Sequence, residues 1–251
     1  MITLGVDLAA GPKATGGCKV EWRDGRAAVQ WVGTGLTDDD ILRCAEGVTA
    51  VGIDAPFGWP TSFVNAITAH HAGQRWPVAA WDKANRRKLR LRATDEHVHD
   101  VTGITPLSVS SDTIAIPATR CASLIDRLGV KDRSGEERVR EVYPAAALLQ
   151  WGLRHKGYKG KENAIRLVEL LAALRVQAPW LEASRPDAEL LAGCDHAFDA
   201  LVASLAARAA WRGLTLRPPA NAVHLARVEG WIAVPRKGSL GDLPLVKPVA
   251  P

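Results

Sequence analysis

Aspartates occur in three apolar segments of the sequence, where an ionised carboxylate needs a partner. Glycine precedes the acid by two positions in two of these segments, as Gly5 before Asp7 and as Gly52 before Asp54. Because alternate residues of a strand share a face, each glycine is expected to clear space beside its carboxylate. Burying a carboxylate without a partner is strongly unfavourable. Each acid is therefore expected to have one of three partners: a bound metal ion, a basic side chain, or loop amides that donate hydrogen bonds at a strand end.

The third segment is a predicted helix with two acids on one face. Asp195 and Asp199 are four residues apart, and like charges at this spacing slightly destabilise an isolated helix. Asp195 falls in the first turn, where the helix macrodipole favours an acid. Asp199 is followed by the run Ala-Leu-Val-Ala-Ser-Leu, which indicates a buried helix. A second acid on such a helix indicates a cation that is shared with other carboxylates.

A divalent metal site is the chemistry that these carboxylates predict. Hard cations such as Mg²⁺ and Mn²⁺ prefer oxygen ligands, and two of them can clamp the attacking water and the leaving oxygen of a phosphodiester. Glu141, which alternates with Val139 and Tyr143 in a short predicted strand, either joins this site or is an exposed acid. The predicted metal ligands are Asp7, Asp54 and Asp199, and the predicted catalytic residues are Asp7, Asp54, Glu141, Asp195 and Asp199.

A basic run in the middle of the chain offers contacts for a polyanionic substrate. Two tryptophans, Trp76 and Trp81, precede it. Lysine and arginine contact phosphates and indole rings stack on bases, so this combination suits a nucleic-acid strand. A solvated basic helix beside core tryptophans is the simpler alternative. The predicted substrate-binding residues are Arg86, Arg87, Lys88, Arg90 and Arg92.

A second basic stretch covers 154–161 and is interrupted by Gly157 and Gly160. Glycine gives a chain segment unusual conformational freedom. This stretch is therefore either a flexible loop over the site or plain surface.

The strands and helices that would position these residues alternate along the chain. Strands are predicted over 2–9, 17–22, 27–33, 49–54, 139–143 and 229–234. Helices are predicted over 37–46, 61–71, 94–102, 117–128, 145–151, 161–175 and 194–211. An opening three-stranded meander followed by strands joined through helices predicts an α/β fold, with a mixed sheet flanked by helices. We expect one domain over 1–236 with helical insertions, then a mobile tail rich in Pro and Gly over 237–251.

Composition is that of an ordinary globular protein, with 47% apolar and 24% charged residues in a chain of 251. No segment approaches the roughly 18 apolar residues of a membrane span. The N-terminus reaches Asp7 without a basic region, so we expect no signal peptide and a cytoplasmic protein. The four cysteines form no Cys-x-x-Cys pair, which argues against a zinc finger or a redox motif. A net charge of +5 mildly favours polyanionic partners such as nucleic acid.

Five short motifs occur in order along the chain and together resemble a known family. They are Gly5-Val6-Asp7-Leu8-Ala9, Gly52-Ile53-Asp54-Ala55-Pro56-Phe57-Gly58, Arg92-Ala93-Thr94-Asp95, Glu141-Val142-Tyr143-Pro144 and Asp195-x-x-x-Asp199-Ala200-Leu201. From about Ile2 to Pro235, the chain resembles the domain-of-unknown-function family 429, whose members are described as predicted nucleases with a ribonuclease H fold.

The resemblance implies a ribonuclease H-like fold with a five-stranded mixed sheet flanked by helices. It also implies a role for each acid of the predicted site. Asp7 would be the acid of the first strand and Asp54 the acid that ends the fourth strand. Asp199, together with Asp195, would supply the acids of the final helix.

Three functions are compatible with the sequence. A metal-dependent nuclease that cleaves DNA or RNA accounts for the acids and the basic run together. A non-catalytic nucleic-acid-binding protein on the same fold accounts for the basic run alone, and it predicts salt-dependent binding that tolerates loss of the acids. A relative of the sugar and acetate kinases would usually carry two such domains and Asp-x-Gly phosphate loops, whereas Asp7 is followed by Leu8-Ala9. We rank the nuclease first and the kinase last.

Overall fold

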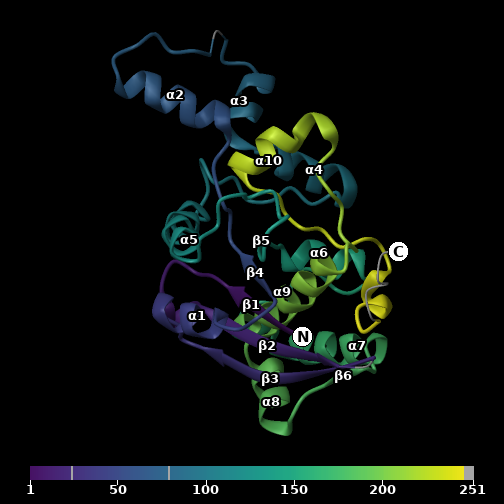
Figure 1. The fold of residues 1–251 in the computed structure, drawn as a ribbon. Coiled ribbons are helices and arrows are strands. Elements are labelled where there is room, and N and C mark those ends of the chain that lie inside the picture. The colour runs from purple at the N-terminus through teal and green to yellow at the C-terminus, as the bar shows by residue number, and fades with distance from the viewer. Residues whose placement is uncertain (24, 79, 246–251) are drawn as a thin grey trace, which may run out of the picture.

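The computed structural model describes residues 1–23, 25–78 and 80–245. Within these residues the chain forms a mixed six-stranded sheet in the order β5-β4-β1-β2-β3-β6 (Figure 1). The strands are β1 (Ile2–Asp7), β2 (Gly16–Arg23), β3 (Arg26–Thr34), β4 (Ala50–Asp54), β5 (Val139–Glu141) and β6 (Leu181–Glu182). The first three form an antiparallel meander, and β4 and β5 continue the sheet in parallel from β1. The α/β class and the mixed sheet that the sequence predicts are confirmed.

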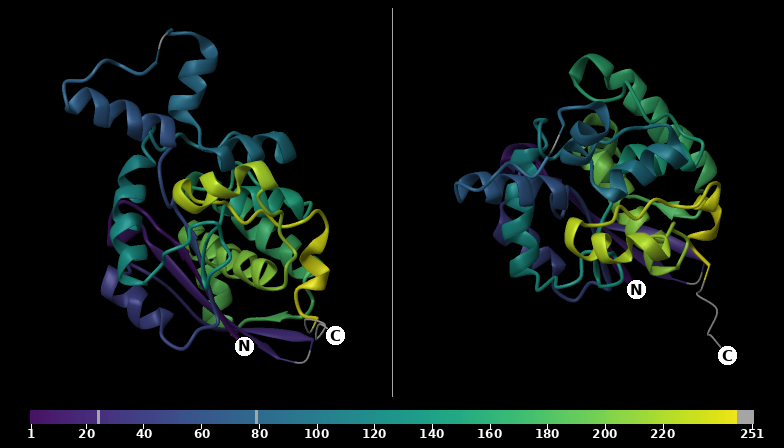
Figure 2. Two further views of the ribbon diagram at one scale, coloured as in Figure 1. Left: turned by 45° about the horizontal axis from the view of Figure 1, so that its top comes forward. Right: turned by 90° about the horizontal axis from the view of Figure 1, so that it is seen from above.

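Helices cover both faces of the sheet (Figures 1 and 2). One face packs against α1 (Asp38–Ala45) and α5 (Ala115–Arg127). The other packs against α9 (Asp195–Trp211), with α6 (Pro144–Gln150), α7 (Ala164–Gln177) and α8 (Arg185–Gly193) beside it. Helices α4 (Ala93–Thr102) and α10 (Val223–Glu229) contact each other, and α2 (Thr61–His71) with α3 (Lys83–Arg90) forms an arm that projects from the body.

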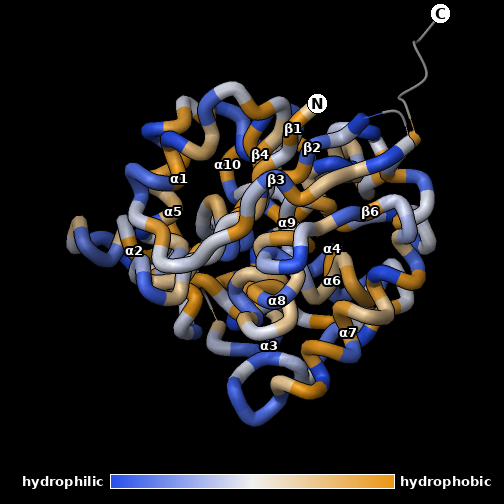
Figure 3. Tube along the Cα trace, turned by 90° about the horizontal axis from the view of Figure 1, so that it is seen from below, coloured by the Kyte–Doolittle hydropathy of each residue, from blue (hydrophilic) through white to orange (hydrophobic). Residues whose placement is uncertain are grey.

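The alternation of β1 decides which helices its side chains contact. Leu4 and Val6 are buried in the core formed with α1 and α5. Thr3, Gly5 and Asp7 face α9 instead, where the Thr3 hydroxyl lies 2.7 Å from that of Ser204. Helix α9 is buried over most of its length, as expected of a helix that is apolar on all sides. Figure 3 shows hydrophobic residues along the central elements and hydrophilic ones toward the periphery.

No single helix among the described residues is long and apolar enough to cross a membrane. Helices α8 and α9 reach that length and apolarity only as a pair, and they are bent by 110° at the break between them. In this structure α9 packs directly across the sheet, where β1, β2 and β4 contact it.

The structure corrects the predicted strands at two places. The described sheet has six strands rather than five, because β6 pairs with Ala27 and Ala28 of β3. A strand of two residues is too short to show alternation in a sequence. The predicted strand over 229–234 is wrong, since Glu229 ends α10 and Ile232 makes only an isolated bridge to Glu141.

The predicted helices and tail are also incomplete. Helix α3 is the solvated basic helix that was the alternative for the basic run, although its sequence, KANRRKLR, has too few apolar residues to show a helical period. The short helices α8 and α10 were not predicted. The mobile tail is wrong for its described part, since Leu240 and Leu243 are buried in the core beside α9. Arg208 of α9 donates a hydrogen bond of 2.9 Å to the carbonyl oxygen of Leu243. Residues 246–251 of the predicted tail lie outside the described residues.

Candidate metal centre

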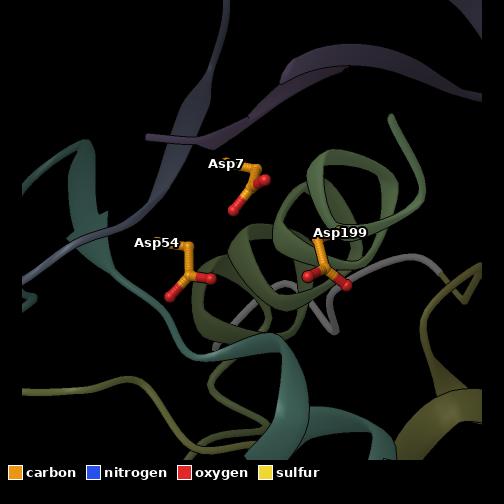
Figure 4. A group of neighbouring side chains, drawn as sticks. All are labelled: Asp7, Asp54 and Asp199. Atoms are coloured by element: carbon orange, nitrogen blue, oxygen red, sulfur yellow. The ribbon is translucent and has the colours of Figure 1, made fainter. Parts of the chain in front are cut away.

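Three aspartates from three separate elements meet where the central strands end. Asp7 ends β1 and Asp54 ends β4, and the two are register partners in the parallel pair of strands. Asp199 comes from the N-terminal part of α9. One oxygen atom of each carboxylate lies within 4.8 Å of an oxygen of both others, and Figure 4 shows the side chains pointing toward a common space. The structure thus brings together the three predicted metal ligands, which we call the aspartate triad.

Glycine at two strand positions allows α9 to approach closely enough for this meeting. A Cβ atom on Gly5 would lie 2.0 Å from the carbonyl oxygen of Ala200, and one on Gly52 would lie 2.5 Å from that of Ala203. Both distances are too short for non-bonded atoms, so a side chain at either position would push the helix away. The sequence interpretation assigned this space to the carboxylates, but the backbone of α9 fills it. The close approach is what carries Asp199 to the strand ends.

Burial and mutual repulsion disfavour the ionised forms of these carboxylates. Asp199 is fully buried, and burial raises its pKa to about 6 in spite of the nearby ammonium group of Lys159. Burial, followed by the negative charge of Asp7, raises the pKa of Asp54 well above its ordinary value. A cation beside the carboxylates would favour their ionised forms, because opposite charge lowers the pKa of an acid.

Asp199 has a resident counter-ion in the loop before α7. The Nζ atom of Lys159 lies 2.6 Å from Asp199 Oδ2, and the hydroxyl of Tyr158 donates a hydrogen bond of 2.7 Å to Asp199 Oδ1. The Asp199 side chain is only 1% exposed, whereas that of Lys159 is 58% exposed. The lysine therefore neutralises a buried acid from the solvent side, where it can be displaced.

Asp195 positions the loop that carries this lysine. The backbone N–H of Gly160 donates a hydrogen bond of 2.8 Å to Asp195 Oδ2. Gly157 and Gly160 bracket Lys159 with φ angles of 70° and 87°, a region that glycine adopts without strain. Asp195 thus lies beside the site but outside the aspartate triad, and we call residues 157–160 the lysine loop.

Asp7 and Asp54 differ in how they are stabilised. The Nδ1 atom of His196 lies 2.6 Å from Asp7 Oδ2, and this hydrogen bond raises the pKa of His196. The carboxylate of Asp54 has no hydrogen bond and no ion pair within the described part of the chain. The triad is therefore a set of carboxylate oxygens in which one member lacks any donor, and this set fits a hard divalent cation such as Mg²⁺ or Mn²⁺.

Glu141 and Arg92, two further predicted site residues, form a buried ion pair with each other. The two terminal nitrogens of the Arg92 guanidinium, Nη1 and Nη2, donate to Glu141 at 2.9 and 2.7 Å. The backbone N–H of Phe57 also donates to Glu141, and Asp95 accepts from Arg92 at 2.8 Å. Glu141 therefore lies outside the triad with its carboxylate fully engaged, and Arg92 has no free donor face for a substrate.

A comparison with protein families decides the relationship that the five motifs indicate. A family model described as "Protein of unknown function (DUF429)" matches residues 5–224. The chain belongs to this family. The matched span contains all three aspartates of the triad, and the resemblance read from the motifs is confirmed. Searches of curated proteins and of solved structures found no match.

The other predicted substrate-binding residues of this DUF429 chain lie on the arm. Arg86, Arg87, Lys88 and Arg90 belong to α3 and are exposed. Arg87 pairs with Glu96 at 2.7 Å. Trp81 is 70% exposed and Trp76 is 38% exposed, so neither tryptophan belongs to the core. The arm therefore presents basic and indole side chains to solvent, and the alternative of core tryptophans is wrong.

Three residues that contact the triad were not among the predicted site residues of this DUF429 chain. Lys159 and Tyr158 come from the lysine loop, and His196 directly follows Asp195 in α9. The sequence does carry a signal for the first two, because glycines bracket them at 157 and 160. No comparable signal exists for His196, since its contact with Asp7 joins residues 189 positions apart.

Proposed function

We propose that the protein is a metal-dependent nuclease on a ribonuclease H-like sheet, in which Asp7, Asp54 and Asp199 hold Mg²⁺ or Mn²⁺. The proposal is carried by the meeting of three carboxylates at the ends of two parallel strands and on the helix that packs across them. The strand order supports the fold type, because an antiparallel meander is followed by strands that lie parallel to β1. Function on this fold must still be argued from the site itself.

Each residue of the site has a distinct part in this proposal. The triad would hold the metal, which when bound would polarise a phosphoryl oxygen and make a bound water more acidic than bulk water. His196 orients the carboxylate of Asp7 through its hydrogen bond. Lys159 neutralises Asp199 in the metal-free protein, and its exposed stem lets the ammonium group turn to a phosphate oxygen of the substrate.

The arm supplies contacts for the rest of a nucleic-acid strand. Arg86 and Lys88 are exposed and form no ion pair within the described residues, so their charges are available to phosphates. The exposed indole of Trp81 provides a surface on which a base stacks. The arm begins at Thr61, soon after the end of β4 at Asp54, so its root is close to the triad along the chain.

Metal binding and cleavage together test the proposal. We expect wild-type protein to bind Mn²⁺ in calorimetric titration and to cleave DNA or RNA oligonucleotides in its presence. The variant Asp7→Asn should lose cleavage while its melting temperature stays equal or rises, because one of three repelling charges is removed. Asp126→Asn, an exposed acid of α5, is the matched control and should keep both activities. An unfolded Asp7→Asn protein would identify Asp7 as structural and contradict the proposal.

A non-catalytic nucleic-acid-binding protein is the second candidate, and one observation favours it. Lys159 and His196 already compensate two of the three acids, so the site has partners of its own without a metal. This candidate predicts binding that weakens with salt and is unchanged when both Asp7 and Asp199 are replaced by asparagine. Full binding by that double variant, with no cleavage by wild type, would establish it over the nuclease.

A further inference from the structure

An apolar cavity of about 260 Å³ lies directly beside the aspartate triad. It shares two residues with the site, Asp54 and Lys159. Most of its remaining lining is apolar, including Pro56, Leu107, Ile114, Val142, Ala145 and Ile232. Asp54, the triad member whose carboxylate has no hydrogen-bond donor among the described residues, is half-buried and lines this cavity. A substrate held at the triad thus has this half-open cavity beside it.

The charged groups in the wall of the cavity are already paired. Arg92 and Glu141 both line it, and they neutralise each other through two hydrogen bonds of 2.9 and 2.7 Å. Among the described residues, the other charged ones in the lining are the two that belong to the site, Asp54 and Lys159. Charge complementarity therefore places a phosphate next to Lys159 and the metal, and an uncharged, apolar-faced group in the cavity.

We infer that this cavity binds the nucleobase of the nucleotide next to the scissile phosphate, an inference that rests on the proposed nuclease function. A base has apolar faces and no charge, and Tyr143 contributes an aromatic ring to the lining. The volume is below the roughly 300–1,000 Å³ of sites for drug-sized ligands. The cavity is therefore of a size for one base and not for a base pair.

The inference defines the class of substrate. A base inside the cavity has left its stack and its pairing partner, which is unfavourable in a continuous duplex and easy in a single strand. We therefore expect cleavage in single strands, at strand ends or at unpaired nucleotides, in preference to fully paired duplex. Sequence-tolerant recognition is expected, because every base offers a flat apolar face.

A comparison of two small phosphates tests the cavity without requiring cleavage. With Mn²⁺ present, wild-type protein should bind deoxyadenosine 5′-monophosphate at least tenfold more tightly than deoxyribose 5-phosphate, which lacks the base. The variant Ala145→Phe fills the cavity and should bind both compounds equally. The matched control Ala172→Phe places the same side chain on an exposed position of α7 and should keep the preference. Leu107→Trp, at a residue that is 55% exposed, is a second filling variant should Ala145→Phe not fold.

Each outcome separates the cavity from the catalytic proposal. The inference is overturned if wild type binds the two compounds equally. It is also overturned if folded Ala145→Phe or Leu107→Trp protein keeps the wild-type preference for deoxyadenosine 5′-monophosphate. Tighter binding of a short-chain phosphatidic acid than of any nucleotide overturns it as well, in favour of a lipid phosphate. A base preference in a protein that cleaves no oligonucleotide supports the cavity and refutes the nuclease. Cleavage that is equally fast beside an abasic residue refutes the cavity alone.

Discussion

Replacing Lys159 with methionine removes the ammonium group that neutralises Asp199 and keeps most of the length of the side chain. If Lys159 holds the place of a cation in the metal-free protein, a metal ion must displace it from Asp199 Oδ2, which lies 2.6 Å from Lys159 Nζ. The variant has no such competitor. We therefore expect the Lys159→Met protein to bind Mn²⁺ more tightly than wild type does.

The size of the effect follows from the geometry of the pair. At 2.6 Å, Coulomb's law gives an attraction of about 1.6 kcal/mol in bulk water and about 6 kcal/mol at an effective dielectric constant of roughly 20. More than half of the Lys159 side chain is exposed, so solvent screens the pair and the lower value applies. Since about 1.4 kcal/mol corresponds to a tenfold change in affinity, the dissociation constant for Mn²⁺ should fall roughly 15-fold.

Calorimetric titration of metal-free protein with Mn²⁺ at neutral pH measures this change directly. Lys156→Met is the matched control, because Lys156 is exposed in the same segment and forms no ion pair with the triad in the part of the chain that the structure describes. It should bind Mn²⁺ within about twofold of wild type, which excludes a general effect of net charge. Equal or weaker binding by Lys159→Met would show that the lysine supports the site structurally and would refute the displacement argument. Cleavage by Lys159→Met should be slower despite the tighter metal binding, because the phosphate loses a cationic contact.

The packing and the charges of the site give three further expectations. Gly5→Ala should lower the free energy of unfolding by about 3 kcal/mol, because the added Cβ would collide with the backbone of α9. Gly11→Ala, whose added Cβ would meet open space, is the control, and equal denaturation midpoints of the two variants would refute this expectation. Glu141→Ala should destabilise by about 3–5 kcal/mol by leaving Arg92 short of a partner, with Mn²⁺ affinity unchanged; a loss of affinity would place Glu141 in the metal site. Because the pKa of Asp199 is raised to about 6 in the folded state, the stability from its protonated form is complete below about pH 4 and is lost as the pH rises through 6. Metal-free Asp199→Asn should therefore gain in melting temperature relative to wild type across that window, and a constant difference would contradict the shift.

The parts of the fold that the sequence predicted correctly depend on local patterns. Alternation in β1 and β4 assigned Asp7 and Asp54 to the same face as Gly5 and Gly52, and in the structure this face meets α9. The apolar composition of the last long helix likewise identified Asp199 as a buried acid. Side chains on one face recur every two residues in a strand and about every four in a helix. These repeats can be recognised in one sequence before the fold is known.

The parts that could not be predicted depend on contacts between distant residues. Arg92 and Glu141 are 49 positions apart, and only the fold reveals that each neutralises the other. Glu141 was assigned to the site from strand alternation and Arg92 from the basic run, and neither pattern shows that the two residues pair. The stretch that contains Lys159 was predicted to be either a loop over the site or plain surface, because its partner Asp199 lies on a different element. Sequence motifs thus point to charged residues that are buried, but they do not identify the oppositely charged residue that each one contacts.

Because α9 packs directly on the sheet, the carboxylate of Asp199 is buried and needs a positive charge beside it. Gly5 and Gly52 let the helix lie directly on the strands, and this contact excludes water from Asp199. An apolar residue at position 199 would fill the same space without the penalty of a buried charge, and replacing buried ions by apolar groups is often stabilising. The acid at position 199 lies opposite two other acids and pairs with Lys159 of the lysine loop. Packing alone does not explain why an acid occupies this position. The proposed divalent cation, which would take over the position of Lys159, would supply that explanation.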